Sequence, residues 1–164
     1  MATVVGAPRI IVWSALTEPE EALHWRPGAQ RLLESPPGEL APGRLLRLRC
    51  LLQDVPVVLE ERTVEVEPGK RLRTQVRFGL FRFEELFSLA DADAMGAHTR
   101  LRLRIATASQ TPLLGGSLDR FAVRRFATEL AATYLAALRD WCELHHAHAS
   151  ARLPALSREH SAAQ

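Results

Sequence analysis

The fold is decided by residues 117–146, which read SLDRFAVRRFATELAATYLAALRDWCELHH. When this stretch is wound at the 100° per residue of an α-helix, its apolar side chains gather on one broad face. These side chains are Val123, Phe126, Ala127, Leu130, Tyr134, Ala137, Leu138, Trp141 and Leu144. Ser117 can accept from the free amides of the first turn, and the pair Gly115-Gly116 breaks whatever precedes it. A helix of about 28 residues is ~42 Å long, so the rest of the chain must supply a large apolar partner.

That partner reads as a curved antiparallel sheet. Alternating apolar and polar residues predict a short first strand at 2–6 and further strands at 46–52, 57–67, 71–78, 81–89 and 99–106. Two short helices are predicted after the first strand, one beginning at Pro8 and one running from Pro19 to Trp25. Prolines and glycines predict a loop at 34–43. One face of this sheet is apolar and the other is charged, as in an antiparallel sheet with one side in water.

The turn at Pro68-Gly69-Lys70 fixes the register of the hairpin around it. A three-residue loop places Glu67 opposite Arg71, and the ladder continues with charged pairs on one face and apolar pairs on the other. The charged face pairs Glu65 with Arg73, Thr63 with Gln75 and Glu61 with Arg77, and the apolar face pairs Val66 with Leu72 and Val64 with Thr74. The next turn, at Gly79-Leu80, pairs Phe78 with Phe81, Val76 with Phe83 and Leu72 with Phe87.

This register turns several polar side chains toward the apolar interior. If the valines of strand 57–67 point inward, so do Glu60 and Arg62, and on strand 81–89 Glu85 points inward opposite Thr74. An ionisable group in an apolar interior is costly unless it is paired or solvated. One interpretation is a polar patch inside a cavity, which anchors a ligand's hydroxyl, carbonyl or carboxylate. The other is that these positions lie near the open end of the sheet, or that a bulge turns them outward.

Two aromatic residues complete the candidate cavity. Tyr134 lies on the apolar face of the long helix, where it either orients a ligand or bonds a backbone group as an ordinary core residue. Phe83 is one of several phenylalanines on the apolar sheet face. The ligand-cavity residues that we predict are therefore Glu60, Arg62, Thr74, Phe83, Glu85 and Tyr134. A cavity glutamate could act as a general acid or base, but the sequence assigns no catalytic residue.

Composition and charge exclude several classes of protein. A length of 164 residues with 47% apolar content suits one domain with a real core, and a net charge of +2 gives no general attraction to nucleic acid or membranes. Glutamates alternate with the arginines of the charged sheet face and no aromatic residues lie between them, so we expect no nucleic-acid partner. No apolar run approaches the ~20 residues of a membrane span, and no signal peptide is evident. We therefore expect a cytoplasmic protein without stable membrane insertion.

The cysteines and histidines do not predict a metal site. Cys50 and Cys142 fall at apolar positions, which favours buried thiols over a disulfide. His145 and His148 lie one helical turn apart, but no third ligand shares their face of the helix. We expect no metal and no cofactor.

Three segments carry a family resemblance. They are APRIIVWSALTEPEEALHW at 7–25, ERTVEVEPGKRL at 61–72, and the final helix with its Gly-Gly lead-in. Together with the order of the elements, they resemble the START-like superfamily, also called SRPBCC or helix-grip, and within it the bacterial polyketide cyclase/dehydrase and lipid-transport-like proteins. The resemblance covers about residues 2–146. It implies an α+β fold in which a curved antiparallel sheet wraps around a long C-terminal helix, with two short helices after the first strand.

The same resemblance implies a domain boundary and a function. We divide the chain into a START-like ligand-binding domain at 1–147 and a loosely ordered tail at 148–164, which contains Pro154. The domain is expected to bind, and thereby transport or sequester, a hydrophobic or amphipathic small molecule in an internal cavity. The alternatives are a polyketide cyclase/dehydratase-like enzyme that uses cavity carboxylates, and a protein–protein interaction module whose interior is filled by side chains. An unpaired edge strand would permit a homodimer.

Overall fold

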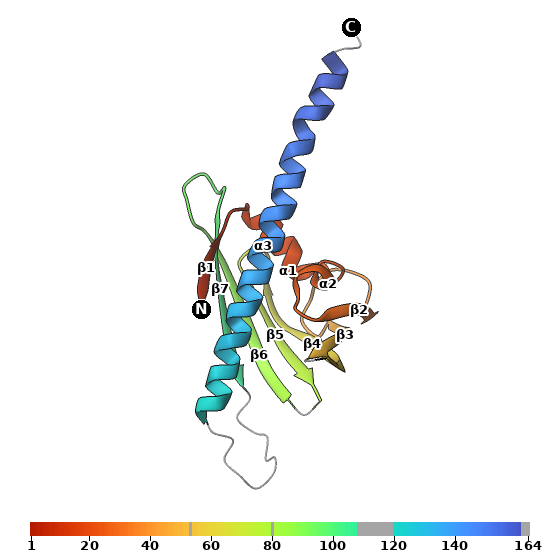
Figure 1. Ribbon diagram of the computed structural model, residues 1–164, viewed down its shortest axis with the longest axis vertical. Helices are drawn as coiled ribbons and strands as arrows, with labels where there is room; N and C mark the ends of the chain where they lie inside the picture. Colours follow the sequence, from red (N-terminus) through yellow and green to blue (C-terminus); the bar gives the residue numbers. More distant parts are fainter. Residues whose placement is uncertain (53, 80, 108–119, 162–164) are drawn as a thin grey trace.

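A seven-stranded antiparallel sheet and one long helix make up the fold (Figure 1). The computed structural model describes residues 1–164 except 53, 80, 108–119 and 162–164. The elements in chain order are β1 (Ala2–Val5), α1 (Arg9–Thr17), α2 (Ala22–Trp25), β2 (Ala29–Glu34), β3 (Leu45–Leu52), β4 (Val55–Glu67), β5 (Arg71–Phe78), β6 (Phe81–Asp91), β7 (Thr99–Thr107) and α3 (Arg120–Ser161).

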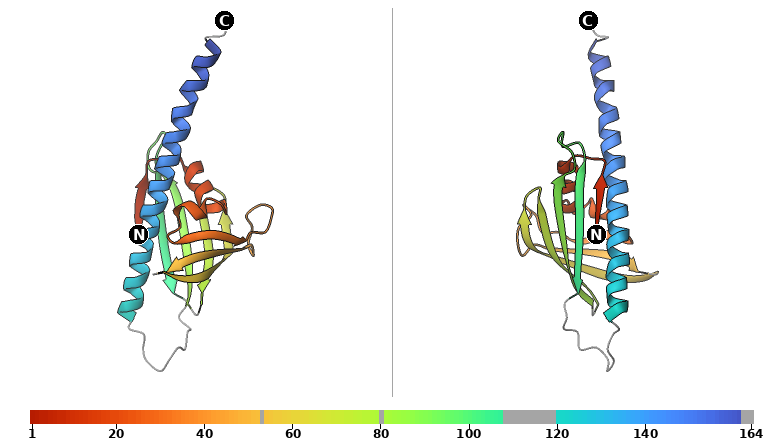
Figure 2. Two further views of the ribbon diagram at one scale, coloured as in Figure 1. Left: turned by 45° about the vertical axis from the view of Figure 1, so that its right-hand side comes forward. Right: turned by 90° about the vertical axis from the view of Figure 1, so that its left-hand side faces the viewer.

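The sheet is a meander from β2 to β7, and the first strand, β1, pairs with the free edge of β7. The strand order is β1-β7-β6-β5-β4-β3-β2, and every neighbouring pair is antiparallel. The sheet curves, and α3 runs along one side of it and contacts β7 and β1 (Figure 2). We call the sheet face toward α3 the inner face. The predicted α+β helix-grip architecture is confirmed.

The core lies between α3 and the inner face. Tyr134 and Leu138 of α3 are buried there, so the predicted apolar face of the helix is confirmed along its centre. Ala131, Leu135 and Cys142, which were not assigned to that face, are buried as well. At its ends the prediction is wrong, because Phe126 and Leu144 are 45% and 54% exposed. The buried stripe is centred on Leu138, and Leu144 lies about 120° around the helix from it, which places Leu144 at the margin of the contact.

The short helices α1 and α2 pack against one end of the core. The indole N–H of Trp25, at the end of α2, donates to the carbonyl oxygen of Ala15 in α1 (2.6 Å). The chain then turns sharply at Gly28, whose φ is +76° and where a Cβ would collide with the carbonyl oxygen of Leu51. Only glycine fits there without strain, since it tolerates positive φ and leaves room for the neighbouring backbone. This turn leads directly from α2 into β2 and fixes the position of Arg26 between them.

Two features differ from the sequence prediction. Strand β2 was not predicted, because residues 29–34 show no clean alternation and their register with β3 shifts twice. The long helix was expected to end near His146, but α3 continues to Ser161 and projects beyond the sheet (Figure 1). Pro154 removes a backbone donor and normally ends a helix, which is why the sequence favoured an earlier end. The expected start at Ser117 lies outside the described residues, and the division of the chain near residue 147 stays a prediction.

The cysteines are free, buried thiols, as expected. Burial raises the pKa of Cys142 to about 12 and also raises the pKa of Cys50. Of the helices that the structure describes, none has a stretch both long and apolar enough to cross a membrane.

Candidate functional site

A bulge in β4 decides which side chains reach the interior. Near the turn the observed pairs are the predicted ones, with Glu67 opposite Arg71 and Glu65 opposite Arg73. Between Glu65 and Thr63 the register shifts by one residue, so that Thr63 lies opposite Thr74. Because side chains alternate between the faces of a strand, this extra residue reverses the facing of every residue before it.

The bulge places Glu60 and Arg62 on the outer face, so their prediction as cavity residues is wrong and the alternative, a bulge that turns them outward, is confirmed. Glu60 accepts from Arg77 Nε (2.9 Å) and Nη2 (2.5 Å), and it is the residue opposite Arg77, where Glu61 was expected. Arg62 is exposed and donates to the carbonyl oxygen of Gly43 (3.4 Å). The same shift turns Glu61 inward, where it is buried.

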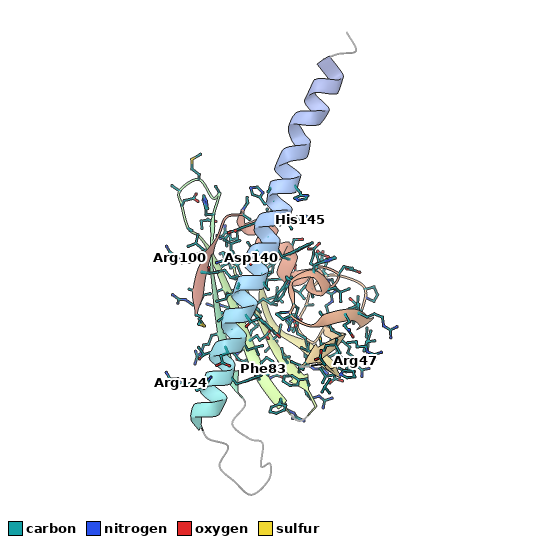
Figure 3. All side chains as sticks on the ribbon, in the orientation of Figure 1. Arg47, Phe83, Arg100, Arg124, Asp140 and His145 are labelled. Atoms are coloured by element: carbon teal, nitrogen blue, oxygen red, sulfur yellow. The ribbon has the colours of Figure 1, made fainter. Side chains whose placement is uncertain are left out.

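The other four predicted residues lie inside. Thr74 and Glu85 are fully buried and face each other across β5 and β6, as predicted, and Phe83 and Tyr134 are nearly so. Figure 3 shows Phe83 beside α3 and Arg47, which belongs to the outer face, at the margin of the molecule. Whether these inward residues bind a ligand stays a prediction.

Arg26 is the buried charged residue of this region that sequence reasoning missed. It is 4% exposed, and its Nη2 donates to Glu61 Oε2 (2.5 Å) and to Glu85 Oε2 (3.4 Å). Its Nη1 donates to the Tyr134 hydroxyl (3.4 Å). We call Arg26, Glu61, Glu85 and Tyr134 the buried ionic cluster. The sequence signal was indirect: a glutamate among apolar residues of an inner strand face requires a counter-charge, but many arginines could supply it.

Aromatic rings surround the buried ionic cluster. The Arg26 guanidinium carbon lies 5.2 Å from the centre of the Trp25 ring and 5.1 Å from that of the Tyr134 ring, within the range of cation–π attraction. Trp25 meets Tyr134 and Phe87 edge to face, with centroid distances of 5.9 and 6.4 Å. The charges and side-chain hydrogen bonds of the interior are therefore concentrated in the buried ionic cluster, and apolar and aromatic side chains surround it.

Burial controls the protonation of the cluster. It raises the pKa of Glu85 to about 7, although Arg26 opposes the change. Burial also raises the pKa of Tyr134 well above its ordinary value, so the phenol stays neutral. Desolvation alone would lower the pKa of Arg26, but Glu61 and Glu85 outweigh it and the pKa lies above its ordinary value. The cluster thus carries one positive charge against one or two negative ones, according to the state of Glu85.

Three buried polar atoms of this region have no hydrogen-bond partner among the described residues. They are Thr74 Oγ1, Glu85 Oε1 and Arg26 Nε. Buried polar atoms are almost always bonded, so unpaired ones mark a place where a water or a ligand atom belongs. A carboxyl whose pKa lies near 7 can also give or take a proton at neutral pH. Within the described part of the chain, no group of three or more His, Cys, Asp or Glu side chains is placed to hold a metal ion.

Comparison with known proteins agrees with the fold. A family model described as "Polyketide cyclase / dehydrase and lipid transport" matches residues 1–143. The Zhui aromatase/cyclase of a Streptomyces species is 15% identical with a TM-score of 0.69, over 87% of this chain and 91% of that one. A START superfamily protein of Mycobacterium smegmatis is 17% identical with a TM-score of 0.64, over 90% and 95%. At these identities the likeness shows the fold alone. A search of curated protein sequences found no match.

Proposed function

Because this chain belongs to the polyketide cyclase/dehydrase and lipid-transport family, we propose that it binds a hydrophobic or amphipathic small molecule between α3 and the inner face of the sheet. The family and the fold support this class of ligand. The observation that carries the proposal is the pair of unpaired buried oxygens, Thr74 Oγ1 and Glu85 Oε1, on an apolar inner face. An apolar site with a few convergent polar groups is the usual form of a small-molecule site.

The energetics favour a ligand over an empty polar patch. A buried donor or acceptor without a partner costs about 1–3 kcal/mol. A ligand that brings one polar atom to Thr74 and Glu85 removes this cost, while its apolar body gains from burial. Affinity would come from the apolar body, and orientation from the polar contact.

Native mass spectrometry of the freshly purified protein, followed by organic extraction, tests this function. A reproducible, stoichiometric hydrophobic adduct is the expected result. The Thr74→Val variant should lose part of the adduct, because it keeps the shape of the side chain but removes the hydroxyl. Glu60→Gln, on the outer face, is the matched control and should retain the adduct. An extract without hydrophobic compounds, from a protein that also fails to bind added hydrophobic probes, would contradict the proposal.

A second candidate is an enzyme of the cyclase or dehydratase kind. The observation that favours it is Glu85, whose pKa of about 7 beside Arg26 suits a general acid or base. Turnover of a polyketide-like substrate should then follow a pH profile with a limb near 7, and Glu85→Gln should abolish that limb. Glu84→Gln, one residue away on the outer face, should leave the profile unchanged. Full turnover in the Glu85→Gln variant would exclude this role.

A further inference from the structure

The buried ionic cluster has no positive charge to spare for an anionic ligand. Arg26 is the one buried basic side chain of the described residues, and it already contacts Glu61 at 2.5 Å and Glu85 at 3.4 Å. With both glutamates ionised the cluster carries a net charge of −1, and with Glu85 protonated it is neutral. A carboxylate entering this region would meet the carboxyl groups of Glu61 and Glu85. The Arg26 Nε–H is an unpaired donor, but it belongs to a cation whose charge these two glutamates already neutralise, so no free positive charge compensates the desolvation of the carboxylate.

The unpaired oxygens instead match a single neutral hydroxyl. Thr74 and Glu85 are directly opposite each other, which places their Cβ atoms about 4.5–5.5 Å apart. Their free oxygens do not bond each other, so a single oxygen atom of a third group, placed between them, would give both a partner. A hydroxyl can accept from the Thr74 O–H and donate to Glu85 Oε1 at the same time. A carbonyl can only accept, and therefore fits Glu85 only while that carboxyl is protonated.

A cationic ligand fits less well than a hydroxyl. It would pair with an ionised Glu85, but the guanidinium of Arg26 lies 3.4 Å from the other oxygen of the same carboxylate and would repel it. A second positive charge would thus compete for a group that Arg26 already holds. The neighbourhood disfavours ligand charges of both signs.

We propose that Thr74 and Glu85 form a subsite for one neutral hydroxyl of a hydrophobic ligand, and that the interior discriminates against carboxylates such as those of free fatty acids. This inference rests on the proposed function, because it describes how the same region selects its ligand. The subsite would distinguish alcohols and phenols from acids that have the same apolar body.

Equilibrium dialysis with a matched set of probes tests the subsite. The probes are naphthalene, 2-naphthol, 2-naphthoate and 2-naphthylmethylammonium, which share one apolar body and, apart from the unsubstituted naphthalene, carry different polar groups at the same ring position. We expect 2-naphthol to bind about tenfold more tightly than naphthalene, which is the gain from one or two buried hydrogen bonds. We expect 2-naphthoate and the ammonium probe to bind more weakly than naphthalene.

Variants assign the preference to named atoms. Thr74→Val should lower the affinity for 2-naphthol about five- to tenfold and leave that for naphthalene unchanged. Thr74→Ser keeps the hydroxyl and should retain the preference, which separates the hydrogen bond from any loss of packing. Glu85→Gln removes a negative charge and should raise the affinity for 2-naphthoate. Glu84→Gln removes the same charge from the outer face and should change no affinity.

Each contrary result has a distinct meaning. If 2-naphthoate or the ammonium probe bound as tightly as 2-naphthol, the charge discrimination would be refuted. If Thr74→Val left the affinity for 2-naphthol unchanged, the free oxygens would serve only an internal water, and the hydroxyl subsite would be refuted while ligand binding stood. If none of the four probes bound, the proposed function itself would be overturned.

Discussion

Replacing Glu85 with glutamine should change how the stability of the protein depends on pH. The carboxyl of Glu85 is fully buried. The ionisable and polar groups around it are the cation Arg26, the carboxylate Glu61, the neutral phenol of Tyr134 and the hydroxyl of Thr74. Burial raises the pKa of Glu85 from 4.5 to about 7 in the folded protein. The unfolded chain releases this proton near 4.5, so between the two pH values the folded state holds a proton that the unfolded state does not.

The size and sign of the effect follow from this difference. The folded state binds the proton more tightly, so the stabilisation is complete below about pH 4.5, declines as the pH rises, and is lost above about pH 7. One pKa unit corresponds to about 1.4 kcal/mol, which gives a loss of about 3 kcal/mol across this window. Glutamine resembles the protonated carboxyl and cannot ionise. Glu85→Gln should therefore match the wild type at acid pH and exceed its stability by about 3 kcal/mol above neutral pH.

Urea unfolding at a series of pH values from about 4.5 to 8.5 measures this difference, because linear extrapolation gives the free energy of unfolding of each protein at each pH. The other titrating groups are common to both proteins and cancel in the comparison. Glu84→Gln, at a half-buried position on the outer face of the same strand, controls for the loss of a carboxylate outside the core. If the two stability curves ran parallel between about pH 5 and pH 8, Glu85 would titrate normally and the reasoning would be refuted.

Three further predictions concern the surroundings of the site. Arg26→Leu leaves buried carboxylates without a counter-charge and should lower the free energy of unfolding by about 3–5 kcal/mol, whereas Arg47→Leu on the outer face should cost less than about 1 kcal/mol in the same urea experiment; equal losses would contradict the buried pairing. Gly28→Ala should lower the melting temperature far more than Gly69→Ala, because both residues have positive φ but only Gly28 lacks room for a Cβ; equal shifts would contradict the close approach. Cys142, whose pKa burial raises to about 12, should react with a thiol reagent at neutral pH no faster than the protein unfolds; rapid labelling of the folded protein would show that the thiol is accessible.

Four of the six predicted cavity residues were placed on the correct face from the sequence. The turn at Gly79-Leu80 and the alternation of the strands beside it placed Thr74 opposite Glu85 and pointed Phe83 inward, and the structure agrees. Helical spacing placed Tyr134 on the buried face of α3 in the same way. These predictions succeeded because strand and helix periodicities are local and hold along an element that no bulge interrupts.

The other two predicted residues, Glu60 and Arg62, depended on a local irregularity. The three-residue loop set the register of β4 and β5 correctly as far as Glu65, but the bulge after it moved Glu60 and Arg62 outward and Glu61 inward. Both arrangements keep a glutamate on each face, so the sequence pattern alone does not distinguish them. They differ in long-range partners, since Glu60 meets Arg77 outside and Glu61 meets Arg26 inside.

The sequence by itself therefore determined the helix-grip architecture, the long apolar helix, the meander of the sheet and the inward pairing of Thr74 with Glu85. These follow from periodicity, turns and the requirement that each apolar face be buried. Only the tertiary structure decided that Arg26 enters the interior, that Glu61 rather than Glu60 meets it, and that β2 forms at the edge. The first two depend on which distant charge offsets the cost of a buried one, and β2 depends on pairing with β3 in a shifted register. All three are decided when the elements pack together.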